Sequence, residues 1–459
     1  MTDQVLQTPL VAKEAAAVAV KSDGARNFSF QVAATLVTRI IMGLNSVVTG
    51  VLVARWLGAK ELGALAVLNI SIAYAVQIGS LGLASANTYF IARDRRRLST
   101  VATNSLVFCF CAGAILALAV VWFARSSPQL FADLPLSLVA IAAAAVPFQL
   151  LSLMGLNVFL AVGLIGRSNL LDLLGQSAIV VNAVLVLVLL HRGLPELITL
   201  NAAATIAVSL VIVVLVARYI SRRTEAGRWQ PDASLLRQMM QYGLKIHLQT
   251  IASLFLFRVD LLIVKYFRGS TEAGVYSVAS QMALLLMLLP GVISTLLFPR
   301  IAAEQDQGGA LACKVTRHAT LVMFVICLLA IPAIYLLPLL YGPAFSAAIE
   351  QALILLPGVF LISIAGVLAQ HFSGTGLPLP LPLFWIAALV LNTVANFLIV
   401  PVHGARGAAI TSSISYALVF ALISFYFHIR TGNRLRDDYV IRGPELRALL
   451  NPRRLFTGT

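Results

Sequence analysis

Long apolar runs alternate with short polar segments along almost the whole chain. A helix that crosses a bilayer needs roughly 20 mostly apolar residues, and about twelve runs meet this requirement. Their approximate ranges are 30–54, 63–86, 102–124, 136–160, 169–190, 198–220, 241–266, 274–299, 316–340, 347–370, 380–401 and 407–428. The pattern predicts an all-α, polytopic membrane protein with about 12 transmembrane helices.

The composition agrees with this pattern. The 459 residues are 60% hydrophobic and only 11% charged, whereas soluble domains average about 45–50% apolar and about 25% charged residues. This excludes a soluble enzyme, a disordered protein and a secreted disulfide scaffold. The four cysteines lie in or beside apolar runs, and Cys109 and Cys111 are too close together for a zinc clip. We therefore expect no metal site and no cofactor.

The basic residues predict an orientation. With the N-terminus in the cytoplasm, most of the 33 Lys and Arg residues fall in inner segments, including Arg93–Arg97 and the tail after His428. The outer segments hold fewer: Arg55, Lys60, Arg125, Arg192, Lys265, Arg268 and Arg406. This bias is typical of a membrane protein with both termini inside. We therefore attribute the net charge of +15 to a basic cytoplasmic face, and we do not expect nucleic acid as a partner.

The two halves of the chain share an internal repeat. Gly58-Ala59-Lys60-Glu61-Leu62-Gly63 precedes Gly269-Ser270-Thr271-Glu272-Ala273-Gly274 by 211 residues. The same offset, within one residue, joins Pro147 to Pro357, Gly163 to Gly374, Gly166 to Gly376, Asn182 to Asn392 and Gly193 to Gly404. An even number of spans in each half predicts a parallel repeat with substrate bound between the halves.

The repeat sets the expected domain organisation. Residues 1–29 form a cytoplasmic tail, and a basic cytoplasmic tail covers 429–459. Between them we expect an N-lobe of six helices at 30–220, a cytoplasmic linker at 221–240 and a C-lobe of six helices at 241–428, around a central cavity. No segment between spans is long enough for a soluble catalytic domain, so function must lie within the helices.

Ionisable side chains inside spans are the first candidate site residues, because each costs about 2.5–3.5 kcal/mol to insert. Arg39 lies about 13 Å into the first span, and Lys245, Arg258 and Asp260 lie in the seventh. The three cations predict a cationic cavity for an anionic substrate group. Asp260 points to a different side from Arg258 and is expected to serve structure or gating. The alternative is a set of salt bridges that hold the helices together.

Polar residues on the same spans complete the candidate set. Ser46 follows Arg39 on a stripe of small and polar residues, and Tyr74 and Gln77 share a face of the unusually polar second span. His247 lies on the face of the seventh span that also carries Arg258. These groups suit a polar or gating wall that binds a sugar; polar contacts between helices are the alternative.

Several segments resemble polysaccharide-transport flippases. In the second half they are Phe257-Arg258-Val259-Asp260-Leu261-Leu262-Ile263, Glu272-Ala273-Gly274-Val275-Tyr276, Leu297-Phe298-Pro299-Arg300-Ile301-Ala302 and Pro401-Val402-His403-Gly404-Ala405-Arg406-Gly407. In the first half, Ala54-Arg55-Trp56-Leu57-Gly58 through Gly63 is similar. The chain thus resembles the oligosaccharide flippase family of the multidrug/oligosaccharidyl-lipid/polysaccharide exporter superfamily over roughly residues 28–428.

The resemblance implies a function without covalent chemistry. Such a flippase passes an undecaprenyl-diphosphate-linked oligosaccharide across the bacterial inner membrane for exopolysaccharide or O-antigen synthesis. The lipid-linked glycan and membrane lipids are the implied partners, together with a polysaccharide polymerase and a chain-length regulator. Arg39 and Arg258 are the positions that would meet the diphosphate.

Other functions remain open at this stage. A multidrug or cation antiporter of the same superfamily predicts an acid in the cavity of the first lobe, but the first span carries Arg39 and no acid. Peptidoglycan-precursor flippases typically have two additional helices. A major-facilitator transporter predicts a glycine pattern that is missing here, and a polytopic glycan polymerase predicts a large outer loop.

Overall fold

The computed structural model describes residues 25–222, 229–288, 290–291, 309–375, 378, 380–433 and 439–441, and these contain helices and no strand. The N-terminal half comprises α2 (Ala25–Trp56), α3 (Ala59–Ser80), α4 (Leu83–Arg93), α5 (Leu98–Ser126), α6 (Pro128–Phe131), α7 (Leu136–Ala143), α8 (Val146–Ala161), α9 (Ile165–Ala183) with the π-turns of η2 (Val184–Leu189), and α10 (Leu194–Ser221). The C-terminal half comprises α11 (Ala233–Leu256), α12 (Val259–Arg268), α13 (Ser270–Leu286), α15 (Ala310–Tyr335), α16 (Leu337–Tyr341), α17 (Ala347–Thr375) and α18 (Pro380–Thr431).

These helices match the expected spans, several of which are broken into two. Nine helical stretches of the described residues are long and apolar enough to cross a membrane. One of them, α18, holds the last two expected spans, which meet at a kink where Gly404 has a φ of 57°. The seventh and eighth expected spans are not among the nine. α11 carries Arg237, Lys245 and His247, and α13 covers only the first part of the eighth span, since residues 289 and 292–299 lie outside the described part of the chain.

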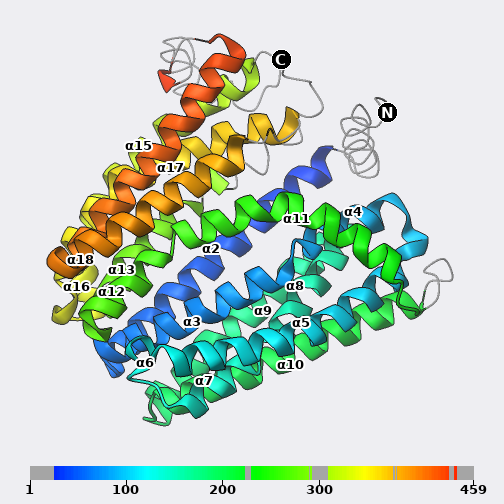
Figure 1. Cartoon of the computed structure of the whole chain (residues 1–459), viewed down its shortest axis with the longest axis horizontal. Helices are drawn as coiled ribbons and strands as arrows, with labels where there is room; N and C mark the ends of the chain where they lie inside the picture. The colour runs from blue at the N-terminus through cyan, green and yellow to red at the C-terminus, as the bar shows by residue number, and fades with distance from the viewer. Residues whose placement is uncertain are drawn as a thin grey trace.

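The helices form two groups (Figure 1). α5, α7, α8, α9 and α10 lie together on one side, and α15, α17 and α18 lie on the other, with α2, α3 and α11 between them. Within the groups, α8 packs against α5 and α10, and α17 packs against α15 and α18. The start of α2 and the end of α18 lie towards the same end of the molecule.

The segment expected as a linker at 221–240 is partly helical. α10 continues to Ser221, and α11 already begins at Ala233. Asp232 caps α11 by accepting a hydrogen bond from the Leu235 amide at 3.0 Å, which satisfies a free donor of the first turn. Asn104 in turn holds the Asp232 backbone through two hydrogen bonds of 2.9 Å. The start of α11 is therefore fastened to the N-terminal half.

The repeated glycine motif forms a close crossing of α3 and α13. Gly58 and Gly269, which precede the two helices, have nearly the same backbone angles, with φ of 89° and 87° and ψ of 178°. A Cβ added to Gly63 would lie 1.9 Å from the Ser270 carbonyl oxygen, and one added to Gly274 would lie 1.9 Å from that of Ala59. The two copies of the motif thus pack against each other, backbone to backbone.

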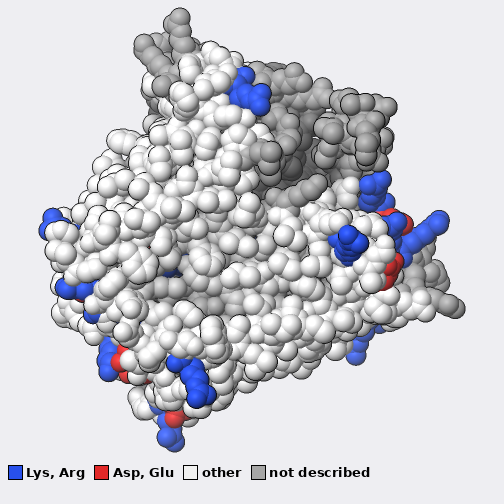
Figure 2. Space-filling model, in the orientation of Figure 1, with Lys and Arg blue, Asp and Glu red and all other residues white. Residues whose placement is uncertain are grey.

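The surface is that of a multi-pass membrane protein. Large apolar side chains such as Leu118, Trp122, Leu398 and Val402 are each about 70% exposed, from 69% to 73%. In Figure 2 the Lys and Arg residues of the visible face gather towards the two ends, and a wide uncharged belt lies between them. Exposed apolar side chains over such a belt fit the hydrocarbon of a bilayer.

Candidate functional site

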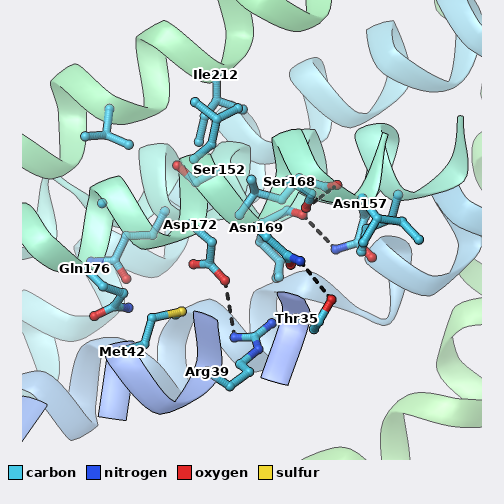
Figure 3. Close-up of a pocket in the computed structure, with 18 of the residues that line it drawn as sticks. Thr35, Arg39, Met42, Ser152, Asn157, Ser168, Asn169, Asp172, Gln176 and Ile212 are labelled. Atoms are coloured by element: carbon cyan, nitrogen blue, oxygen red, sulfur yellow. Dashed lines mark hydrogen bonds and ion pairs between the residues drawn. The ribbon is translucent and has the colours of Figure 1, made fainter. Parts of the chain in front are cut away.

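A pocket of about 800 Å³ lies within the N-terminal group of helices, beside the first half of α2 (Figure 3). Side chains of α2, α8, α9 and α10 line it. Its polar lining consists of Gln31, Thr35, Arg39, Gln149, Ser152, Asn157, Ser168, Asn169, Asp172, Gln176 and Thr205. Its apolar lining is aliphatic, with leucine, isoleucine, valine and methionine side chains. Such a polar wall inside membrane-crossing helices marks a candidate binding site.

Arg39 and Asp172 lie next to each other in the wall of this pocket. An Nη of Arg39 lies 3.2 Å from a carboxylate oxygen of Asp172, so the two form an ion pair between α2 and α9. The side chain of Arg39 is 50% exposed and that of Asp172 is 26% exposed. The pair therefore remains accessible from the pocket, and the other N–H groups of the guanidinium stay available to a ligand.

The neighbouring amides are partly engaged. Asn169 donates a hydrogen bond to the Thr35 hydroxyl at 2.8 Å, which ties α9 to α2 beside the ion pair (Figure 3). Asn157 donates to the Leu153 carbonyl at 2.8 Å. In contrast, the carboxamides of Gln31, Gln149 and Gln176 make no hydrogen bond to any described residue. These three amides are free to bind a ligand.

Asp260 does not line this pocket. It is 1% exposed and lies at the start of α12, where it accepts hydrogen bonds from Tyr276 at 2.5 Å, Ser412 at 2.7 Å and the Leu261 amide at 2.7 Å. These donors come from α12, α13 and α18. The carboxylate thus joins three helices in the interior of the C-terminal half.

Arg258 and Lys245 lie apart from Arg39. Arg258 is half-buried at the junction of α11 and α12. It lies close enough to Asp260 for their opposite charges to attract, but it makes no direct ion pair with any described residue. It does not line the N-terminal pocket. Lys245 lies in α11, and its side chain falls outside the described part of the structure. Arg39 and Arg258 are therefore not brought together at one pocket.

The other four candidates contact the opposite half of the chain. Ser46 is exposed and accepts a hydrogen bond from Gln281 at 2.7 Å. Tyr74 is buried and stacks on Phe255 with ring centroids 4.0 Å apart. His247 is 5% exposed and faces the backbone of Gln77. Tyr74 and Gln77 do not line the pocket, so the expected aromatic surface for a sugar is absent there.

The end of the molecule away from the start of α2 carries a second set of contacts between the halves. The Asp133 carboxylate, in the turn before α7, binds the Lys60 ammonium at 3.1 Å and the Lys265 ammonium at 2.5 Å, and also accepts from Ser270. Burial alone would raise the pKa of Asp133, but the hydrogen bonds from Lys265, Ser270 and Lys60 outweigh it and hold that pKa well below its ordinary value. This cluster is close to the Gly63–Gly274 crossing, because Lys60 and Ser270 belong to the same motifs.

Sequence reasoning missed most of the pocket lining. Asp172 was not among the candidate residues that the sequence predicted. A signal was present, since Ser168, Asp172, Gly175 and Gln176 recur at helical spacing along one face of α9. Glutamine and asparagine at such positions should therefore be counted with the charges.

Comparison with known proteins places the chain. Residues 25–305 match the family model described as polysaccharide biosynthesis protein. An inward-facing multidrug resistance MATE transporter of the MOP superfamily superposes with a TM-score of 0.68 at 16% identity, covering 85% of this chain and 94% of that one. The lipid II flippase MurJ, in an inward closed conformation, gives 0.69 at 14% identity, covering 86% and 87%.

A third solved structure has the same arrangement. A MOP superfamily transporter from Pyrococcus furiosus superposes with a TM-score of 0.60 at 16% identity, over 88% of this chain and 95% of that one. These likenesses confirm the predicted all-α, two-lobed fold. The chain belongs to the polysaccharide biosynthesis protein family and has the fold of the MOP transporters.

Proposed function

We propose that this protein is a flippase that carries an undecaprenyl-diphosphate-linked oligosaccharide from the inner to the outer leaflet of a bacterial inner membrane. Membership of the polysaccharide biosynthesis family supports the glycan, and the fold that it shares with MurJ supports a lipid-linked cargo. The observation that carries the proposal is the polar pocket of about 800 Å³ among helices that cross the membrane. A site of this kind binds a polar head group without transforming it, so no enzymatic step is proposed.

Movement by alternating access follows from the two-lobed fold. The lobes meet tightly at the outer end, through the Gly63–Gly274 crossing and the Asp133 cluster. The pocket lies beside the first half of α2, towards the end of the molecule that we propose to be cytoplasmic. Head groups would enter there, while the lipid tail stays in the bilayer. Release outside requires the outer contacts to separate.

The proposal gives the cations different roles. Arg258 is the principal candidate for the diphosphate, because it has no direct ion pair with a described residue. Lys245, on the same helix, is a second candidate. Arg39 is already paired with Asp172, and its role is treated below. A polysaccharide polymerase and a chain-length regulator are the proposed protein partners, since they act on the delivered glycan.

Deletion of the gene tests the proposal directly. We expect lipid-linked repeat units to accumulate on the inner leaflet, and glycan at the cell surface to fall. Wild-type protein should rescue both measurements, and Arg258→Ala should not. Normal export in the deletion strain would contradict the proposal.

A cation or multidrug antiporter is the second candidate, and one observation favours it. The structure brings an acid into the N-lobe pocket, because Asp172 of α9 lies there although the first span has none. The absence of an acid from the first span was therefore a weak argument against an antiporter. In the same deletion strain, this alternative predicts increased susceptibility to cationic drugs with unchanged surface glycan.

A further inference from the structure

We infer that the N-lobe pocket binds the sugar portion of the cargo, and that the diphosphate binds outside it. This inference rests on the proposed function and specifies which part of the head group each region recognises. It assigns Arg39 to sugar recognition, whereas the sequence argument assigned it to the diphosphate. Three features of the pocket carry it: its balance of charge, its unpaired amides and its aliphatic walls.

The charge balance opposes a diphosphate. Among the described residues that line the pocket, Arg39 and Asp172 are the only charged ones, and they form an ion pair. Their charges cancel, so the pocket offers no surplus cation. Each of the two phosphate groups of such a diphosphate carries about one negative charge on its non-bridging oxygens, and such groups are normally bound by unpaired Arg or Lys side chains or by a metal ion. A neutral polar group avoids this conflict.

The unpaired amides suit a sugar. Gln31, Gln149 and Gln176 come from α2, α8 and α9 and make no hydrogen bond to a described residue. Each carboxamide offers both donors and an acceptor. A sugar hydroxyl both donates and accepts, and so does an acetamido group. Amides spread over three helices can therefore match several hydroxyls of an oligosaccharide, which a charged group alone cannot do.

The ion pair adds to this recognition. Asp172 accepts hydrogen bonds and Arg39 donates them, and both are partly exposed to the pocket at 26% and 50%. Held 3.2 Å apart, the two groups can meet neighbouring hydroxyls of one sugar, one as acceptor and the other as donor. In this arrangement the pair does not have to separate when the ligand binds.

The walls and the size set the class of ligand. No aromatic side chain is among the described residues that line the pocket, so it lacks the ring surface that favours flat organic cations. Leu153, Leu156 and Ile179 supply apolar surface for the C–H face of a ring. A volume of about 800 Å³ lies within the range of small-molecule sites. A neutral sugar fits these features better than a drug cation.

Lipid binding to the full chain in nanodiscs tests the inference. The probes are undecaprenyl diphosphate without sugar and the same lipid carrying N-acetylglucosamine or galactose, measured by native mass spectrometry. Wild-type protein should bind at least one sugar-bearing lipid more tightly than the bare lipid. Gln149→Leu and Gln176→Leu should each lower the affinity for the sugar-bearing lipid by about 3- to 10-fold, the effect of one or two lost hydrogen bonds. Both variants should leave the affinity for the bare lipid unchanged.

Two further variants sharpen the test. Gln129→Leu is the matched control, because Gln129 is exposed in α6 and does not line the pocket; it should change neither affinity. Gln176→Glu keeps the shape of the side chain and adds a negative charge. It should leave the affinity for bare undecaprenyl diphosphate unchanged, and thermal unfolding of each variant checks that it folds.

The outcomes separate this inference from the proposed function. If Gln176→Glu or the leucine variants lower the affinity for the bare lipid as much as that for the sugar-bearing lipids, the diphosphate enters the pocket and the inference is wrong. It is also wrong if the leucine variants change neither affinity, or if wild type gains nothing from either sugar. Failure of wild type to bind any of the three lipids would contradict the proposed function itself.

Discussion

Asp172 and Asp260 are both carboxylates in expected membrane spans, one in each half of the chain, yet their surroundings differ. Asp260 is 1% exposed and accepts hydrogen bonds from Tyr276, Ser412 and the Leu261 amide. Asp172 is 26% exposed, faces a pocket and pairs only with Arg39 among the interactions described for it. The first carboxylate joins helices, and the second remains open to a ligand.

The difference shows that a charge inside a span does not by itself identify a binding site. Both acids meet the criterion of being costly to bury. The number of donors around each one separates them: a carboxylate with its acceptor sites filled is part of the fold, whereas one with a single partner and a cavity beside it can still bind. The predictions below test this separation, beginning with the largest effect.

Asp260→Ala should destabilise the protein most. The substitution removes the acceptor of three hydrogen bonds, and it removes the negative charge that attracts Arg258. Loss of a buried charged partner costs about 3–5 kcal/mol. Thermal unfolding of the purified protein in detergent measures the loss. Tyr276→Phe removes one donor and should cost about 1 kcal/mol; equal effects of the two variants would contradict this account.

Gly274→Ala should come next. The added Cβ would lie 1.9 Å from the Ala59 carbonyl oxygen, so α3 and α13 must move apart. Overpacking of this kind costs about 1–3 kcal/mol. Gly166→Ala is the matched control, since an added Cβ there meets nothing within 4 Å. The same measurement applies, and comparable stability of the two variants would show that the crossing tolerates separation.

Asp133→Asn should have a smaller, pH-dependent effect. The pKa of Asp133 is lowered in the folded protein, so its stabilisation is complete above the ordinary carboxyl pKa of about 4 and is lost as the pH falls towards the lower folded value. At pH 7 the variant should be less stable by about 1–2 kcal/mol. The difference between the variant and wild type should narrow below pH 4. A difference independent of pH would mean that the Lys265 and Lys60 contacts do not act through this charge.

Asp172→Asn should have the smallest effect on stability and a clear effect on transport. Because the pair with Arg39 is half exposed, its loss should change the free energy of unfolding by less than about 1 kcal/mol. Surface glycan should nevertheless fall severalfold in the complemented deletion strain. A large loss of stability would place Asp172 with Asp260, as a residue that serves the fold.

Much of the architecture could be predicted because membrane helices leave a strong one-dimensional signal. Apolar runs located the helices, and the repeat placed Gly58 and Gly269 at equivalent turns. It also matched Asn182 with Asn392, and the structure gives both a partner on the following helix segment, Asn201 and Ser412. Such features depend on local spacing or on symmetry, and both can be found in the sequence.

The site was harder to predict because it depends on the rotation of each helix about its axis. Arg39 and Asp172 are far apart in the chain, and nothing in their own segments indicates that α2 and α9 turn these side chains towards each other. Expecting Arg39 beside Arg258 assumed that charged faces meet between the lobes. The structure instead places Arg39 in a pocket within one lobe, beside amide side chains that were not among the predicted site residues.

The crossing of α3 and α13 has a consequence for how such a chain could be assembled. Each half carries one copy of the same glycine motif, and the copies fit each other in both directions, Gly63 on Ser270 and Gly274 on Ala59. That reciprocity is the property of an interface between identical subunits related by a two-fold axis. A six-helix chain with one copy of the motif would already have the contact surface needed for a symmetric dimer. Fusion of two such chains would leave that contact surface intact.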